Sequence, residues 1–448
     1  MQEKAKSSSV SGKSHGHLLR VLGVGFGLAV IIGNTIGAGI FRTPGVVAAQ
    51  LPNAWLFLTV WIVGGLYALL GAVQLAELGT MLPRSGGQYV FSRYALGEYA
   101  GFIVGWSDWI STCGTTAAVA IVIGTFAEAL FPSLDGMSMA IAATVAIVFA
   151  VLQWRGIVLG SEVQNVTSLL KALAFIILIV AAFIFGGGVV KNVSAPQVSG
   201  GTHLAVAFVL ALQAVIYTYD GWSGVIYFSE EVRDPGKDVP RSLFGGVLLI
   251  ILIYMLVNIA LLYVLPIEKI AGQEFAAGVA AQLMFGRYGD TIFRSLTIVS
   301  MLSGINAYHL MASRVLFAMS RDGLFMRRGA TVNAGGTPTL ALLLSTSVAV
   351  LFILFGQTFE KVITVLAFFF VANYTLSFIS LLVLRRREPH KERPYRAWGY
   401  PWTTLFALIA SVVFLLGAVA SDSRNSIYAL LLLAISYPVF RTLRHSSN

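Results

Sequence analysis

Five ionisable side chains lie inside segments that are otherwise long and apolar. They are Glu77, Asp108, Lys171, Asp220 and His309. An ionisable group near the centre of a bilayer costs about 2.5–3.5 kcal/mol on insertion scales, so each needs a partner or a function. The chemistry open to such groups is the binding of an ammonium group, an inorganic cation or a proton.

Asp220 stands in the sequence Tyr217-Thr218-Tyr219-Asp220-Gly221-Trp222, where polar residues and a glycine interrupt an apolar segment. Its carboxylate can hold a substrate ammonium or a coupling cation. Alternatively, it can cap the N–H groups of a helix that resumes after the interruption. The residues alone leave both roles open.

Lys171 lies about ten residues into the apolar segment 161–186, roughly 15 Å along a helix. At that depth its ammonium must find carbonyls or hydroxyls, and the end of an interrupted helix supplies carbonyls with a partial negative charge. Lys171 can therefore do the structural work of a bound sodium ion and can also exchange protons. We expect Glu77, close to Pro83, to face water, and Asp108 and His309 to be satisfied by neighbouring hydroxyls rather than to relay protons.

A second interruption, Gly33-Asn34-Thr35-Ile36-Gly37-Ala38-Gly39, lies in the first apolar segment. Amides at the start of the half-helix beginning near Gly39 favour an anion, and carbonyls ending the half-helix before Gly33 favour a cation. A small zwitterion, which carries one negative and one positive group, would match these amides and carbonyls. The alternative is a packing face of small residues formed by Gly33 and Gly37.

These residues must be positioned by membrane helices, because 57% of the 448 residues are hydrophobic, only 11% are charged and the mean hydropathy is +0.81. A span needs roughly 20 apolar residues. The sequence predicts twelve spans, near residues 20–46, 54–79, 92–129, 136–154, 161–186, 203–229, 241–265, 291–319, 337–355, 359–384, 402–420 and 425–441.

The two interruptions begin about 185 residues apart, at matching positions in halves of similar length, as in inverted-repeat transporters. We therefore predict a disordered cytoplasmic tail (1–19), a first inverted repeat (20–186), a second (203–385), two further spans (402–441) and a second cytoplasmic tail (442–448). Residues 83–89 are expected to link spans two and three, with the third span entered near Phe91. Residues 266–286 are expected to form a helical segment on the outer face, either a cap over the vestibule or a surface helix.

Most Lys and Arg residues fall in segments that are cytoplasmic if both termini are inside. This bias accounts for the net charge of +10. Nucleic-acid binding is therefore not needed to explain the excess of basic residues. The single cysteine, Cys113, allows no disulfide framework. Since no metal-ligand cluster, nucleophile–base arrangement or phosphate loop occurs, we predict neither a cofactor nor enzymatic activity.

Short motifs occur in a fixed order along nearly the whole chain. They are Gly37-Ala38-Gly39-Ile40-Phe41, the link 83–89, Gly101-Phe102 with Gly105-Trp106, Tyr219-Asp220-Gly221-Trp222, Glu230-Glu231, Arg233-Asp234-Pro235, Pro240-Arg241, Ser313-Arg314, Arg321-Asp322-Gly323 and Arg393-Pro394-Tyr395-Arg396. In this order they resemble the amino acid–polyamine–organocation superfamily, most closely bacterial relatives of the L-type amino acid transporters.

The resemblance implies the leucine-transporter fold, in which five plus five inverted helices, with helices 1 and 6 broken, are followed by two extra helices. It implies that the substrate contacts backbone or side chains in both breaks and in span ten. The substrate-binding residues would be Ile31, Ile32, Thr35, Ile36, Gly37, Ala38, Gly39, Tyr217, Tyr219, Asp220 and Asn373. The backbone from Thr35 to Gly39 would hold the carboxylate, and carbonyls near Ile31, Ile32 and Tyr217 the ammonium.

By the same resemblance, Tyr217 and Trp222 would gate the site. Lys171 would occupy the position of a sodium ion and bridge toward Ser300 and Ser303. Ala38 stands where relatives often have serine, and Asp220 where they often have glycine. Animal L-type transporters pair by a disulfide with a heavy subunit through a loop cysteine that is lacking here, so no disulfide-linked subunit is expected.

Together these observations predict a secondary transporter that moves L-amino acids across the plasma membrane by alternating access, independently of sodium. It would act as an exchanger or as a proton-coupled symporter, with spans one, two, six and seven rocking against the rest. The alternatives are an amine or polyamine transporter of the same fold and an amino-acid-binding membrane sensor.

Overall fold

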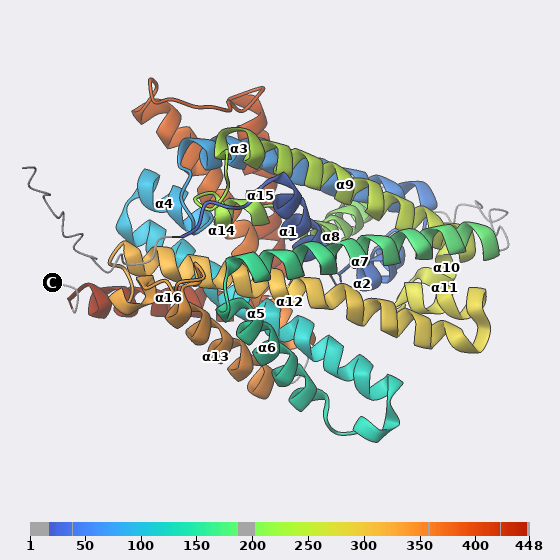
Figure 1. Ribbon diagram of the computed structural model, residues 1–448. Helices are drawn as coiled ribbons and strands as arrows, with labels where there is room; N and C mark the ends of the chain where they lie inside the picture. The colour runs from blue at the N-terminus through green and yellow to red at the C-terminus, as the bar shows by residue number, and fades with distance from the viewer. Residues whose placement is uncertain (1–17, 38, 187–201, 357–358, 422, 446–448) are drawn as a thin grey trace, which may run out of the picture.

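The computed structural model describes residues 18–37, 39–186, 202–356, 359–421 and 423–445 (Figure 1). Most of the predicted tails, and Ala38 in the first interruption, lie outside the described residues. Within them the chain forms helices and, apart from two isolated bridges, no β-structure. The α-helices are α1 (Val24–Thr35), α2 (Gly39–Gln50), α3 (Ala54–Met81), α4 (Gln88–Leu96), α5 (Glu98–Leu130), α6 (Ser138–Trp154), α7 (Ile157–Phe185), α8 (Thr202–Tyr219), α9 (Pro235–Val264), α10 (Ile267–Ile270), α11 (Ala276–Phe285), α12 (Gly289–Arg321), α13 (Thr339–Gly356), α14 (Phe359–Arg387), α15 (Trp402–Ser421) and α16 (Ser423–His445).

Among the described residues, seven helices are long and apolar enough to cross a membrane, and α1 with α2 forms a further candidate bent by 48°. The shorter apolar helices α6, α13 and the apolar part of α16 coincide with three more of the predicted spans. The chain is thus an all-helical, multi-pass membrane protein. Its division into five plus five plus two spans stays a prediction.

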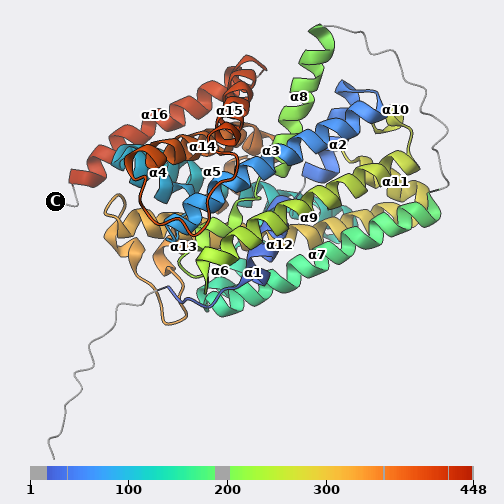
Figure 2. The same ribbon diagram turned by 90° about the horizontal axis from the view of Figure 1, so that it is seen from above.

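α5 lies at the centre of the molecule, because 83% of an apolar stretch of 18 residues in this helix is buried. α5 packs against α12, α14, α6 and α13. By contrast, only 22% of the apolar stretch of the same length in α15 is buried. α15 and α16 lie beside α14 at one side of the bundle, as Figure 2 shows.

The helical path is interrupted at both predicted places, which confirms these two breaks. α1 ends at Thr35, Ile36 leaves the helical region with ψ of 86°, and α2 begins at Gly39. α8 ends at Tyr219, and Gly221 follows with φ of +104°, a conformation that favours glycine. The chain then forms a 3-10 helix, η3 (Gly224–Phe228), rather than the α-helical half expected from the sequence.

Two other expectations are wrong. The third span does not begin near Phe91, because α4 already begins at Gln88 and Gly97, with φ of +100°, separates it from α5. Glu77 does not face water, because its side chain is fully buried. Its carboxylate lies 2.6 Å from Arg385 and 2.9 Å from Arg393 and also accepts the N–H of Ala397 at 2.7 Å.

The segment 266–286 forms α10 and α11 rather than one helix. Both pack against α2, and α11 also packs against α12. Between them, Glu274 pairs with Arg42 of α2 at 2.6 Å, and the ring of Phe275 packs against Phe293 of α12. The segment therefore packs along α2, against Arg42 and Gly45.

Candidate functional site

The break between α1 and α2 leaves carbonyls without helical partners, and Lys171 of α7 satisfies two of them. Its Nζ donates to the carbonyls of Gly33 at 2.8 Å and Ile36 at 2.5 Å. The side chain is fully buried. The ammonium therefore sits at the carbonyl end of α1, where the helix dipole favours a positive charge.

The structure places the two predicted serine partners of Lys171 on α12. Ser303 donates its hydroxyl to the carbonyl of Ser300 at 3.1 Å, and the hydroxyl of Ser300 is buried without a hydrogen-bond partner among the described residues. The contacts of Lys171 described in the structure are to α1 and the break rather than to these hydroxyls.

Two tyrosines satisfy the remaining carbonyls of the first break. Tyr308 of α12 donates its hydroxyl to the carbonyl of Asn34 at 2.9 Å. The hydroxyl of Tyr254, on α9, lies 2.8 Å from the carbonyl of Thr35 and 2.9 Å from that of Thr218 at the second break. A hydroxyl has one proton, so Tyr254 shares it between the two carbonyls and in this way ties the two breaks together.

The two breaks lie directly against each other. The side-chain amide of Asn34 donates to the carbonyl of Gly221 at 3.1 Å. A Cβ added at Gly221 would lie 2.9 Å from the backbone of Asn34 and Thr35, closer than side chains pack. Gly221 is thus required both by its positive φ and by this close approach.

A small cavity, of about 40 Å³, lies beside these contacts. Its polar lining includes Asn34, Thr35, Gly37, Tyr217, Asp220 and Tyr308, and Val119 and Phe370 form part of its apolar wall. Two lining atoms, Asn34 Oδ1 and Thr35 Oγ1, are buried and have no hydrogen-bond partner among the described residues. Unpaired buried polar atoms at a cavity are suited to bind a polar ligand.

Asp220 lines this cavity and accepts the hydroxyl of Tyr374, on α14, at 2.7 Å. The backbone amide of Gly221 is a further hydrogen-bond partner of its carboxylate. Among the described residues, no Lys, Arg or His forms an ion pair with Asp220. The carboxylate therefore both contacts the backbone of the break and faces the cavity, so binding and capping stay open as its roles.

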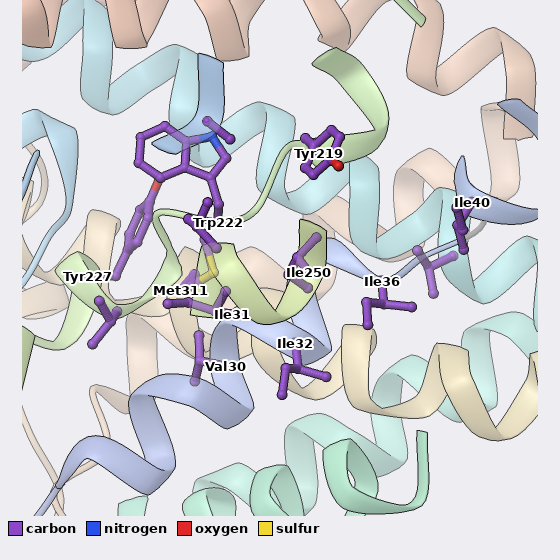
Figure 3. Close-up of a cluster of buried hydrophobic side chains, with 14 of the residues drawn as sticks. Val30, Ile31, Ile32, Ile36, Ile40, Tyr219, Trp222, Tyr227, Ile250 and Met311 are labelled. Atoms are coloured by element: carbon purple, nitrogen blue, oxygen red, sulfur yellow. The ribbon is translucent and has the colours of Figure 1, made fainter. Parts of the chain in front are cut away.

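Several predicted site residues lie together at the cavity and others lie behind it. Thr35, Gly37, Gly39, Tyr217 and Asp220 line it. The side chains of Ile31, Ile32 and Ile36 are instead part of the buried apolar core (Figure 3). The carbonyl of Ile32 accepts the N–H of Ile36, and the carbonyl of Tyr217 accepts that of Asp220.

Three further predicted residues pack around the second break without lining the cavity. Tyr219 packs its ring against Tyr254 at 4.9 Å between centroids, and Trp222 stacks on Tyr374 at 4.9 Å. Asn373 is buried on α14 and accepts the hydroxyl of Ser107 at 2.9 Å.

Sequence reasoning missed the tyrosines at positions 254 and 308 and the polar side chain of Asn34. It considered only ionisable groups as candidates inside the apolar segments. A tyrosine in such a segment is a weaker signal, but its hydroxyl also needs a partner when buried.

Comparison with known proteins identifies a matching family and several similar transporters. A family model described as "Amino acid permease" matches residues 27–437. The chain is 28% identical to the serine/threonine exchanger SteT of Bacillus subtilis (strain 168), over 94% of this chain and 96% of that protein. It is 26% identical to the b(0,+)-type amino acid transporter 1 of Mus musculus, over 94% and 87% of the two chains. It is 29% identical to the Asc-type amino acid transporter 1 of Homo sapiens, over 85% and 74%.

Proposed function

Because the chain belongs to the amino acid permease family, we propose that it is a secondary transporter that carries L-amino acids across the plasma membrane by alternating access. The observation that carries this proposal is the cavity between the two breaks, with Asp220 and two unpaired polar atoms in its wall.

An amino acid zwitterion matches the charges around the cavity. The first amides of α2, which begins at Gly39, have no partners inside the helix, and the dipole of α2 favours a carboxylate there. The carbonyls of residues 33–36 already accept hydrogen bonds from lysine and tyrosine side chains. Asp220 and Asn34 Oδ1 are then the best-placed acceptors for the ammonium group.

Alternating access requires contacts on each side of the cavity that can open in turn. On the side where α1 begins, Arg314 of α12 forms a bidentate pair with Glu231, at 3.0 Å for both bonds, and both side chains are fully buried. Leu22 also pairs with the backbone of Glu231 and Arg233. On the other side, the hydroxyls of Thr43 and Thr218 lie 2.6 Å apart. We propose that the first set closes the cytoplasmic path and that Tyr217 and Trp222 move when the opposite path closes.

Sodium independence is the expected consequence of Lys171. Its amino group occupies the carbonyl end of α1 and hydrogen-bonds the carbonyls that a metal ion would otherwise bind there. The single cysteine, Cys113, is buried inside α5, so a disulfide-linked subunit is not part of the proposal. Both termini are proposed to be cytoplasmic, as the distribution of basic residues indicates.

The proposal is tested by counterflow in proteoliposomes, with L-serine, L-threonine, L-alanine, L-arginine and putrescine as candidate substrates. Preloaded unlabelled amino acid should accelerate entry of the labelled one. Acceleration by putrescine alone would indicate an amine transporter. Saturable binding without any acceleration would indicate a sensor and refute the proposal.

A further inference from the structure

A second buried acid, Asp108, lies near the proposed substrate site. It is only 3% exposed, and both carboxylate oxygens lie 2.9 Å from the hydroxyl of Tyr227 of η3. On α5, Asp108 precedes the cavity residue Thr115 by two helical turns, about 10 Å along the axis. It therefore lies between the cavity and the end of the molecule closed by Glu231 and Arg314.

Among the described residues, Asp108 has a hydroxyl donor, Tyr227, and no Lys, Arg or His paired with it. On the packed elements, the described cationic groups inside the bundle have other partners, and the remaining titratable groups are tyrosines and one acid. Arg314 of α12 is paired with Glu231, and His309 of α12 contacts the carbonyl of Ile305 through Nδ1. Arg93 of α4 is paired with Asp322. The others are the tyrosines Tyr227 of η3, Tyr374 of α14 and Tyr89 of α4, and the acid Asp220.

Asp108 and Asp220 meet at the second break, because Tyr227 of η3 bonds Asp108 and η3 begins four residues after Asp220. Two ionised carboxylates close together in a low-dielectric interior repel each other, and each would be buried with hydroxyl or amide partners only. A single proton shared by the pair removes most of that cost. When the proton is on Asp108, Asp220 is ionised and can take the ammonium of a substrate at the cavity.

We propose that Asp108 binds the proton that moves together with the substrate, which makes the transporter a proton-coupled symporter. This inference rests on the proposed function. A proton from the outer side forms an O–H bond with the carboxylate of Asp108, and this charge neutralisation leaves Asp220 ionised for the ammonium. When the opposite side opens, η3 separates from α5, Tyr227 leaves the carboxyl, and water takes the proton away.

Tyr227 links this proton site to the part of the chain that must move. Its backbone carbonyl accepts the N–H of Gly86, and its ring lies where a Cβ at Gly87 would be, in the loop between α3 and α4. η3 also carries Phe228, over which the guanidinium of Arg314 lies. A displacement of η3 would therefore break the Asp108 contact and the buried Glu231–Arg314 closure together.

The test compares Asp108→Asn with the wild-type protein in two assays, using the amino acid that gives the strongest counterflow. An inward gradient of one pH unit with the membrane potential clamped sustains about tenfold accumulation if one proton moves per substrate. We expect about tenfold accumulation for the wild type and none for Asp108→Asn. Counterflow should persist in the variant, because asparagine imitates the protonated acid.

Three variants distinguish proton binding from a structural role. Tyr227→Phe removes the hydrogen bond but keeps the carboxyl, so accumulation should persist. Glu128→Gln changes an acid on the same helix that bonds the N–H of Ser138, and it should also behave as wild type. If Asp108→Asn does not fold, the smaller, uncharged Asp108→Thr takes its place.

The outcomes separate this inference from the proposed function. Proton-driven accumulation by Asp108→Asn equal to that of the wild type would overturn the inference. So would wild-type counterflow without any proton-driven accumulation, although the transport function would then stand. Absence of counterflow for every amino acid would remove the proposed function and this inference with it.

Discussion

The hydroxyl of Tyr254 offers the sharpest test of how the two breaks are held. It is fully buried and is the hydrogen-bond donor to the carbonyls of Thr35 and Thr218. Tyr254→Phe removes one oxygen and no ring contact. Leaving a buried acceptor unpaired costs about 1–3 kcal/mol. The carbonyl of Thr35 keeps the N–H of Gly37 at 2.9 Å, so the loss falls on the carbonyl of Thr218, and we expect destabilisation within that range.

The matched control is Tyr219→Phe. Tyr219 packs against Tyr254, but its own hydroxyl is buried without a partner among the described residues. Removing that oxygen should leave the stability unchanged or raise it slightly. Both variants lose the same atom from neighbouring aromatic rings, so non-specific effects on packing are matched.

The measurement is the thermal stability of detergent-solubilised protein, followed by fluorescence-detected size-exclusion chromatography, together with the substrate affinity from counterflow. Tyr254→Phe should melt at a lower temperature and bind substrate more weakly than Tyr219→Phe. A loss of 1–3 kcal/mol corresponds to a factor of about 5–160 in an equilibrium constant. Equal behaviour of the two variants would refute the reasoning that the shared hydroxyl holds the breaks together.

Four further outcomes are expected. Asp220→Asn should weaken transport of L-arginine more than that of L-alanine in competition assays; an equal loss for both would favour the capping role. Replacement of sodium by choline should leave uptake by the wild type unchanged, whereas Lys171→Ala should abolish or uncouple transport in a protein that still elutes as a folded species; strict sodium dependence would contradict the role given to this lysine. Glu77→Gln should lower the unfolding free energy by about 3–5 kcal/mol, because it weakens a buried pair with two arginines, while Glu388→Gln at an exposed pair should change the melting temperature little.

The positions of the breaks could be predicted because their cause is local. Glycine and polar residues in an apolar segment disfavour a continuous helix at Gly33–Gly39 and Tyr217–Trp222. Lys171 could also be matched to the end of α1, since a buried ammonium needs carbonyls. Its two acceptors, Gly33 and Ile36, confirm that argument at the level of atoms.

The remaining features depend on contacts between distant segments. The partners of Glu77 lie more than 300 positions later in the sequence. Its position near the end of a span therefore wrongly predicted that it faces water. The hydroxyl of Tyr254 meets both breaks only because α9 packs against α1 and α3. The α4–α5 turn depends on Gly97, a single residue whose φ of +100° divides an otherwise continuous helical sequence.

The carboxylate of Glu77 has a consequence for how the protein can divide into moving parts. It fastens the end of α3 to the end of α14 and to the loop at Ala397 through three strong contacts. A hinge between those two helix ends would leave a buried charge without its partners, so we expect the two ends to move together. This differs from the motion of span two against span ten that the sequence predicted, and we expect the sliding surface of the transport cycle between α14 and α5 instead.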